Sequence, residues 1–406
     1  MKRSVDELAL FGGPPAFQEP RVVGRPNVGD RDRLLQRIAG VIDTRRLTNN
    51  GPLVQEFERR IADLLDVRHC IAVCNGTTGL EIAIRALGLS GEVIIPSLTF
   101  VATAHALRWQ QIRPVFCDID PESHTIDPSR VEALITPCTT GIIGVHLWGR
   151  PCDVEALADV ARRHNLKLLY DAAHAFSCSR RGRMIGNFGS AEVFSFHATK
   201  VVNAFEGGAV VTNDDDLASK VRLMRNFGLD ALACAQDVGV NGKMSEASAA
   251  MGITSLESIE EFVAANHRKY QRYQQELMDV AGVRLAAYDE REKANYQYVV
   301  LELDEARAGI TRDQLVDVLW GENVQARRYF YPGCHLMEPY RSDAPGGRWA
   351  LPHTERVAAG LICLPTGAGV TLGDIQAICG IVRLAVLQAE GIRRRWSTRR
   401  SVAQLV

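Results

Sequence analysis

The sequence has almost no net charge, no long apolar run and no closely spaced pair of cysteines. Its 406 residues carry a formal net charge of −1, so electrostatics give no reason to expect nucleic acid or a membrane surface as a partner. No stretch of 18 apolar residues occurs, and no transmembrane helix is therefore predicted. The first residues, MKRSVDELALFGG, contain no long apolar core, so we expect no secretory signal there.

The ten cysteines lack C-x-x-C spacing, which argues against a metal site such as a zinc site. Several lie inside apolar runs, such as Cys117 in PVFCDI and Cys363 in LICLP, where a buried, small hydrophobic side chain is the default interpretation. So many free thiols are typical of a reducing compartment. The sequence therefore predicts a cytoplasmic protein without a metal.

Apolar segments with strand and helix periodicity alternate from about residue 67 to residue 213, with helices such as PSRVEALI. Each strand is apolar throughout, which is typical of a mostly parallel sheet covered by helices on both faces. A long helical stretch with a candidate break follows, and then strands such as VQARRYF alternate with two more helices. The sequence predicts an α/β protein with an N-terminal arm (1–30), a large domain (31–250), a smaller C-terminal α/β domain (251–390) and a solvated basic tail (391–406).

Two features lie at strand ends, where sheets of this kind bind ligands. In CNGTTG, Gly76 permits close backbone approach, and the N–H groups and hydroxyls around Thr77 and Thr78 could hold a phosphate. A plain turn with a threonine cap explains the same residues. Phe100 follows another strand end, where its ring could cover a flat cofactor or pack in the core.

Asp171 and Lys200 lie at the ends of two further apolar strands. An aspartate there needs a partner, either as a helix cap or ion pair or as part of a site. Lys200, beside His197 and Ser195, would be partly desolvated, which lowers the pKa of its amine and lets it form a Schiff base with an aldehyde. Taken alone, the lysine also fits a structural role, in which its amine reaches for solvent.

Together the four features match the needs of pyridoxal phosphate. This cofactor requires a lysine for its aldehyde, a carboxylate at its pyridine nitrogen, a phosphate cup and a flat group on its ring. Asp171 precedes Lys200 by 29 residues with a strand between them. That order is typical of the largest fold group that uses this cofactor, and the sequence therefore predicts a pyridoxal phosphate enzyme.

A set of motifs in a fixed order resembles the DegT/StrS family of sugar-nucleotide aminotransferases over roughly residues 10–385. The motifs are LTNNGPLVQEFE, CNGTTGLEIAIRAL, IIPSLTFVATAHA, YDAAHA, SFHATK, EGGAVVTND, RNFG, YFYPGCHLMEPYR and LICLP. The resemblance implies fold type I, the aspartate aminotransferase fold. We therefore expect a mostly parallel, seven-stranded sheet sandwiched by helices in the large domain, with a smaller C-terminal α/β domain.

The resemblance also implies roles for residues around the cofactor ring. Lys200 matches the lysine that binds the aldehyde and moves the proton, and Asp171 matches the partner of the pyridine nitrogen. Phe100 occupies the position that stacks on the ring. His174, in DAAHA, is expected beside the ring, where it can hydrogen-bond the cofactor hydroxyl.

The cofactor phosphate and the oligomeric state are linked by the same resemblance. Gly76, Thr77 and Ser195 match the phosphate cup. Asn226, in RNFG, matches an asparagine that reaches the phosphate from the neighbouring subunit. The resemblance therefore implies a homodimer with shared active sites, in the C2 symmetry that is the commonest closed form.

Four residues are implied near the sugar nucleotide. His335 and Tyr331 match a segment close to this substrate, and His197 either tunes Lys200 or faces the sugar. Lys243 stands in NGKMS where the family usually has arginine. A lysine would contact pyrophosphate as a point charge and not through two parallel hydrogen bonds, which leaves the role of Lys243 open.

The function that the resemblance implies is transfer of an amino group from L-glutamate to a nucleotide-linked keto-deoxysugar. The form SFHATK…EGG favours dTDP-4-keto-6-deoxyglucose, with the 4-amino-4,6-dideoxy sugar as product for deoxyaminosugar biosynthesis. A 3-keto sugar nucleotide or a cyclitol is the alternative acceptor. A dehydratase would carry histidine in place of Lys200. A non-catalytic sugar-nucleotide binding or regulatory protein on the same fold is the alternative of a different class.

Overall fold

The computed structural model describes residues 2–344, 346 and 349–396. A seven-stranded sheet forms the centre of the large domain, with strand order β2-β10-β9-β6-β5-β3-β4. Only β10 runs antiparallel to its neighbours. The strands are β2 (His69–Val73), β3 (Glu92–Pro96), β4 (Arg113–Cys117), β5 (Thr139–Val145), β6 (Lys167–Asp171), β9 (Ala191–Ser195) and β10 (Gly208–Thr212). The prediction of a mostly parallel, seven-stranded sheet is confirmed.

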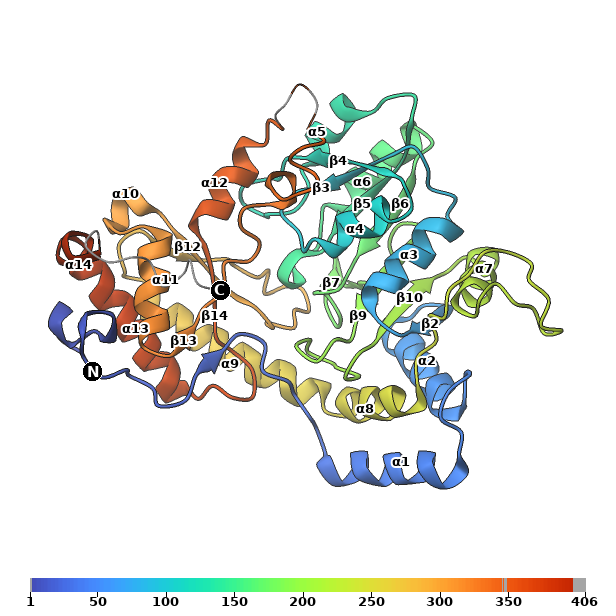
Figure 1. Cartoon of the computed structure of the whole chain (residues 1–406), viewed down its shortest axis with the longest axis horizontal. Helices are drawn as coiled ribbons and strands as arrows, with labels where there is room; N and C mark the ends of the chain where they lie inside the picture. Colours follow the sequence, from blue (N-terminus) through green and yellow to red (C-terminus); the bar gives the residue numbers. More distant parts are fainter. Residues whose placement is uncertain (1, 345, 347–348, 397–406) are drawn as a thin grey trace.

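Helices cover both faces of this sheet (Figure 1). On one face, α3 (Gly76–Ala86), α4 (Ala102–Arg108) and α7 (Asp215–Arg225) bury side chains such as Ile71 and Val73 of β2. On the other face, α2 (Pro52–Leu65), α6 (Val154–Arg163) and α8 (Glu246–Glu257) pack against alternate strand residues such as Ala72. Successive strand residues point to opposite faces, so a strand that is apolar throughout needs a helix on each side.

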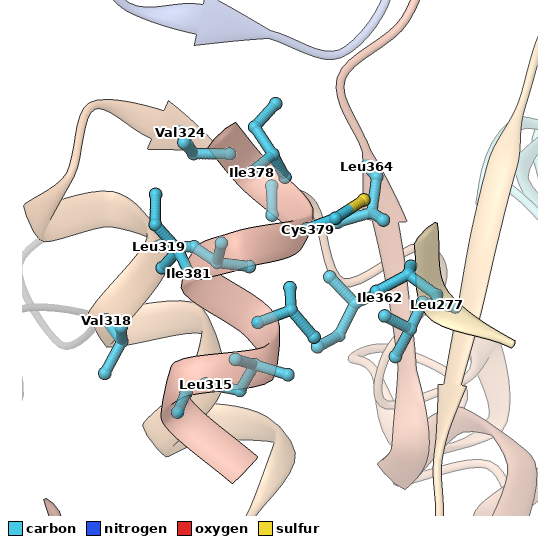
Figure 2. Close-up of a cluster of buried hydrophobic side chains, with 14 of the residues drawn as sticks. Leu277, Leu315, Val318, Leu319, Val324, Ile362, Leu364, Ile378, Cys379 and Ile381 are labelled. Carbon is cyan, nitrogen blue, oxygen red and sulfur yellow. The ribbon is translucent and has the colours of Figure 1, made fainter. Parts of the chain in front are cut away.

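A smaller antiparallel sheet, β11 (Val283–Leu285), β12 (Val299–Leu303) and β14 (Leu361–Leu364), lies in the C-terminal part of the chain. Figure 2 shows its core, where Leu277 of α9 (Ile259–Leu277), Leu315 of α11 (Arg312–Gly321) and Ile378 of α13 (Leu372–Leu387) meet Ile362 of β14. The boundary that we propose between the two domains, at residues 250/251, falls inside α8.

The remaining helices and strands complete the described part of the chain. They are α1 (Arg31–Thr44), α5 (Pro128–Val131), α10 (Glu305–Ala308), α12 (Pro352–Gly360), α14 (Ala389–Trp396), β1 (Arg21–Val22), β7 (Ser179–Arg180), β8 (Arg183–Met184) and β13 (Val324–Gln325). The described residues form 3-10 turns at Val5–Glu7, Ala9–Phe11, Glu132–Leu134, Leu147–Gly149 and Cys334–Leu336. The candidate break in the long helical stretch is confirmed, because α8 ends and α9 begins on either side of Ser258.

Two segments differ from the sequence-based expectation. The predicted strand VQARRYF forms only β13, because it pairs with β1 of the arm for two residues and then turns so that Arg327 bridges to Cys363 of β14. The predicted helix PSRVEALI is α5 followed by the 3-10 turn Glu132–Leu134. The first segment changes its pairing partner before a longer strand can form, and the second passes from α-helical to 3-10 geometry.

The N-terminal arm lies against the small domain and then against the loop that follows β9. The buried carboxylate of Glu322 accepts hydrogen bonds from the backbone N–H groups of Ala9 and Ala16, both at 2.7 Å. Further along the arm, the side chain of Asn27 donates to the carbonyl of Val201 at 3.3 Å, and Asn203 donates to the carbonyl of Asn27. The arm therefore connects the small domain to the loop that carries Lys200.

The expectation of a solvated tail from residue 391 is wrong for its first part. Residues up to Trp396 continue in α14, where Ile392 is buried and the indole Nε1 of Trp396 donates to Asp317 at 2.8 Å. The apolar side of this helix packs on the small-domain core, which a count of arginines does not reveal. Residues 397–406 lie outside the described part of the chain. Among the described residues no single helix has the length and apolarity of a membrane span. Of the helix pairs in this part of the chain, α13 and α14 together have that length and apolarity, but they are bent by 80° relative to each other.

Candidate active site

A cavity of about 310 Å³ lies where strands of the large sheet end and α3 begins, closed on one side by residues of the small domain. Eight of the residues predicted from the sequence line it: Gly76, Thr77, Phe100, Asp171, His174, Ser195, His197 and Lys200. They come from four separate segments, because the carboxyl ends of parallel strands meet at one edge of a sheet.

One end of the cavity is formed by the first turn of α3. Asn75 caps this helix, and its side-chain oxygen accepts a hydrogen bond from the N–H of Thr78 at 2.8 Å. The N–H groups of the first helical turn have no acceptor inside the helix, and the hydroxyls of Thr77 and Ser195 line the same space. A helix N-terminus with added hydroxyls suits a phosphate group.

Two glycines make this cradle close enough to hold a small group. A Cβ on Gly76 would lie 3.1 Å from the Cβ of Ser195. A Cβ on Gly208, the second glycine of EGG, would lie 2.7 Å from the backbone of Asn75 and Gly76. Side chains at these positions would displace the helix start, so the cradle depends on both glycines.

Asp171, the last residue of β6, is buried in the wall of the cavity and is 6% exposed. Its Oδ2 accepts a hydrogen bond from the hydroxyl of Thr103 at 2.7 Å, and its Oδ1 accepts from the N–H of Ala173 at 3.1 Å. Burial raises the pKa of the Asp171 carboxyl, and these hydrogen bonds together with the charge of Lys200 oppose part of that increase. A positive partner in the cavity would therefore favour its ionised form.

Lys200 lies in a turn after β9, where its backbone N–H donates to the carbonyl of His197 at 2.9 Å. Its Nζ lies in the cavity wall and donates to the hydroxyl of Tyr298 at 3.3 Å. Desolvation lowers the pKa of Lys200 to about 8, and the charge of Asp171 acts in the opposite direction. Roughly a tenth of this amine is consequently uncharged at pH 7, far more than for a lysine of ordinary pKa, which suits a nucleophile.

Aromatic side chains form the other walls. Phe100 is 57% exposed, and its ring centroid lies 6.0 Å from that of Phe330, which comes from the small domain. The ring centroid of His174 lies 4.4 Å from that of Tyr298 and 5.9 Å from that of Phe330. Burial lowers the pKa of His174 well below its usual value, and its Nδ1 accepts a hydrogen bond from the N–H of Trp148 at 3.2 Å. His174 is therefore neutral, with its proton on Nε2.

The other four predicted residues do not line this cavity. The Nζ of Lys243 donates to the side-chain oxygen of Asn226 at 3.0 Å and lies 4.4 Å from the ring centroid of Phe227. Tyr331 is 46% exposed, and its ring packs against the guanidinium of Arg312 at 4.2 Å.

His335 is fully buried, and its Nδ1 lies 2.6 Å from the hydroxyl of Ser97. A direct contact between His335 and a ligand would require that side chain to become exposed. Its assignment to the substrate stays a prediction, as do those of Asn226, Lys243 and Tyr331.

Several residues of the site were not predicted from the sequence. Thr103 lies in the motif IIPSLTFVATAHA, but nothing in its spacing indicates that its hydroxyl reaches Asp171. Tyr298, Tyr329 and Phe330 come from the small domain. Tyr329 and Phe330 lie in the motif YFYPGCHLMEPYR, from which we selected Tyr331 and His335 instead, and Tyr298 lies outside the motifs. Only the packing of the two domains brings these side chains together.

Comparison with known proteins decides the family. A sequence model of the DegT/DnrJ/EryC1/StrS aminotransferase family matches residues 29–383. The chain belongs to this aminotransferase family. It is 36% identical to dTDP-4-amino-4,6-dideoxy-D-glucose transaminase of Shigella dysenteriae, over 90% of this chain and 99% of that relative. It is also 36% identical to GDP-perosamine synthase of Caulobacter vibrioides (strain ATCC 19089 / CIP 103742 / CB 15), over 88% of this chain and 95% of that relative.

A solved structure is also very similar to this chain. DesI, crystallised in the presence of its TDP-sugar product, superposes with a TM-score of 0.94 at 50% identity, over 97% of this chain and all of that chain. The predicted fold type I is confirmed by this likeness and by the order of the large sheet. The prediction of a sugar aminotransferase is confirmed by the family and by the named relatives.

Proposed function

We propose that this aminotransferase uses pyridoxal phosphate to move the amino group of L-glutamate to a nucleotide-linked 4-keto-6-deoxy sugar. The favoured acceptor is dTDP-4-keto-6-deoxyglucose, which gives the 4-amino-4,6-dideoxy sugar. The observation that carries the proposal is that Lys200, with a pKa lowered to about 8, lines the same cavity as Asp171 and the first turn of α3. A reactive amine, a buried carboxylate and a phosphate cradle are the groups that this cofactor needs.

The residues present fit the cofactor by their chemistry. The start of α3, with Thr77 and Ser195, would hold its phosphate, and Lys200 would hold its aldehyde end. Asp171 would hold the ring nitrogen, and Phe100 would cover the ring. When bound, the cofactor supplies an electron-withdrawing ring that stabilises negative charge on the substrate carbon.

The chain itself moves the proton. Once its amine is released, the Nζ of Lys200 can take a proton from one substrate carbon and return it to another position, as a general base and then a general acid. Its lowered pKa suits both roles, because the ideal catalytic pKa lies near the working pH. The proton on Nε2 of His174 is free to be donated into the cavity toward an oxygen of the ligand.

Relatives support the choice of substrate. The relatives of Shigella dysenteriae and Escherichia coli are named dTDP-4-amino-4,6-dideoxy-D-glucose transaminases, and DesI was crystallised with a TDP-sugar. The Caulobacter relative is named for a GDP-sugar at the same 36% identity. Since the DesI chain is 50% identical, a thymidine nucleotide is favoured over guanosine.

We propose further that the enzyme is a cytoplasmic homodimer. Asn226 and Lys243 do not line the active-site cavity of their own subunit, and their side chains hydrogen-bond each other. Both side chains are therefore available to the active site of a second copy. All ten cysteines are free, which agrees with a reducing compartment.

Product analysis tests the substrate. The purified protein is incubated with L-glutamate and, in separate assays, with each candidate acceptor. The acceptors are the dTDP-linked and GDP-linked 4-keto-6-deoxy sugars, of glucose or mannose configuration, and a 3-keto sugar nucleotide. The products are then identified by mass spectrometry and NMR. We expect amination of the dTDP-linked 4-keto sugar to be fastest, and we expect Lys200→Ala to abolish it. Turnover of only the 3-keto sugar, or equal turnover by Lys200→Ala, would contradict the proposal.

A further inference from the structure

Asp171 is held by a short chain of hydroxyl groups. The hydroxyl of Thr99 lies 2.9 Å from the hydroxyl of Thr103, which lies 2.7 Å from Oδ2 of Asp171. Both threonines are buried, at 1% and 0% exposure. Thr99 precedes α4 and Thr103 lies in the first turn of this helix. Both hydroxyl groups therefore come from the start of one helix.

The chemistry of the three groups sets the direction of these hydrogen bonds. An ionised carboxylate can only accept, so Thr103 donates its single hydroxyl proton to Asp171. Thr103 then has only lone pairs left for Thr99, and Thr99 must donate to it. Each bond polarises the next, and both point toward the negative charge.

If Asp171 were protonated, this one-way pattern would not be required, because the carboxylic acid could itself donate. The separation of 2.7 Å between the oxygens of Thr103 and Asp171 fits a hydrogen bond to either form of the carboxyl group. A hydroxyl group that donates to Asp171 stabilises the carboxylate relative to the acid.

Other groups around Asp171 do not take this role. Ala173 donates a backbone N–H to Oδ1. Lys200 acts on Asp171 through its charge. His146, which follows the adjacent strand, also lowers the pKa of Asp171 through its charge, but its ring nitrogens face Glu192 and the N–H of Cys152 and make no hydrogen bond to Asp171. Within residues 2–344, 346 and 349–396, Thr103 supplies the side-chain hydrogen bond to this carboxylate.

We propose that Thr103 is a positioning residue that keeps Asp171 ionised and oriented, so that Asp171 holds the ring nitrogen of the bound cofactor in its protonated form. This inference rests on the proposed function. Burial works against the charged form of Asp171, and the hydrogen bond from Thr103 is the first of the effects that oppose it. Without that bond, the proton shared by Asp171 and the ring nitrogen shifts toward the carboxylate.

Three variants test the role of Thr103. Thr103→Val keeps the shape of the side chain and removes the hydroxyl, and Thr103→Ser restores the hydroxyl. Thr354→Val is the matched control, because the buried Thr354 hydroxyl donates to the buried carboxylate of Asp118 at 2.8 Å, away from the cavity. Each protein is loaded with pyridoxal phosphate labelled with ¹⁵N in the ring, and the ¹⁵N chemical shift reports whether that nitrogen carries a proton.

We expect Thr103→Val to move the ¹⁵N signal toward the unprotonated value and to lower kcat about tenfold, the effect of one pKa unit, with little change in KM. Thr103→Ser should return both to near the wild-type values. Thr354→Val should lower the Tm and leave the ¹⁵N signal unchanged. If Thr103→Val does not fold, Thr99→Val tests the same chain at its first bond, with a smaller shift of the same sign.

The outcomes separate the inference from the proposed function. The inference alone is overturned if wild-type protein binds the cofactor and aminates the sugar, and Thr103→Val has the same ¹⁵N signal and kcat. Failure of the serine variant to restore the signal also overturns it. Wild-type protein that binds no pyridoxal phosphate overturns the proposed function, and the inference with it.

Discussion

Asp171 and Asp118 are two buried aspartates at strand ends of the same sheet, and their surroundings differ in one respect. Asp171 ends β6 and is 6% exposed, and Asp118 directly follows β4 and is 3% exposed. Each accepts a hydrogen bond from a buried threonine hydroxyl, from Thr103 and Thr354 respectively. In sequence both look alike, as an acidic residue after an apolar strand.

The difference lies in how many donors the protein supplies. Asp118 accepts three more hydrogen bonds from backbone N–H groups, two of them in the first turn of α12, so it anchors that helix to the large domain. Asp171 accepts only one more, from Ala173, and faces a cavity. A strand-end aspartate whose lone pairs are filled is structural, and one left short of donors beside a cavity is available for a ligand.

The largest expected difference is in activity. Asp171→Asn should lower kcat by about 10² to 10³, the size of losing one preorganised electrostatic contact in a catalytic site. Asp118→Asn should change kcat less than about threefold in protein that is folded, because Asp118 does not line the cavity. Steady-state kinetics with glutamate and the dTDP-linked 4-keto sugar measure both. Equal losses of kcat in the two variants would contradict the different roles that we assign to Asp171 and Asp118.

The order reverses for stability. Asn at 118 would direct its amide N–H₂ against the N–H of His353 or Thr354, and we expect the free energy of unfolding to fall by about 2–4 kcal/mol. Asn at 171 can donate to Thr103 and still accept from Ala173, so the apoprotein should be as stable as wild type or slightly more stable. Urea unfolding of the two apoproteins at pH 7 measures the difference. A larger loss for Asp171→Asn would contradict our assignment of roles.

A third test concerns the amine beside Asp171. Desolvation lowers the pKa of Lys200 from 10.5 to about 8 in the folded chain. Between about pH 8 and 10.5 the unfolded chain therefore holds a proton that the folded chain has lost, and the free energy of unfolding rises with pH. Apo Lys200→Met should lack this rise, which urea unfolding at several pH values detects. Parallel pH profiles for wild type and variant would show that the amine is not desolvated.

The smallest expected effect is at Tyr298. Tyr298→Phe removes the acceptor 3.3 Å from Nζ of Lys200 and keeps the ring beside His174. A single neutral acceptor at this distance contributes little, so we expect kcat to change about two- to fivefold. Tyr288→Phe is the control, since its hydroxyl donates to backbone carbonyls outside the cavity. A loss as large as that of Asp171→Asn would place Tyr298 in the catalytic machinery.

The sequence alone was sufficient for the large sheet and for the residues at its carboxyl edge. Apolar strands alternating with amphipathic helices require a mostly parallel sheet with helices on both sides, because each strand must be covered on both faces. Asp171 and Lys200 then had to meet at the same edge, and the cavity contains both. The two-residue β13 and the packed α14 could not be predicted, since each depends on a distant partner.

What only the tertiary structure decided is which polar groups are satisfied. Thr103 and Asp171 are 68 residues apart, Tyr298 and Lys200 are 98 apart, and Thr354 and Asp118 are 236 apart. No local pattern records such contacts, because they arise when the two domains and the helix starts pack together. The sequence determined that a carboxylate and a lysine would face one site. The fold determined that Asp171 remains short of donors while Asp118 does not, and this difference separates a carboxylate available to a ligand from a structural anchor.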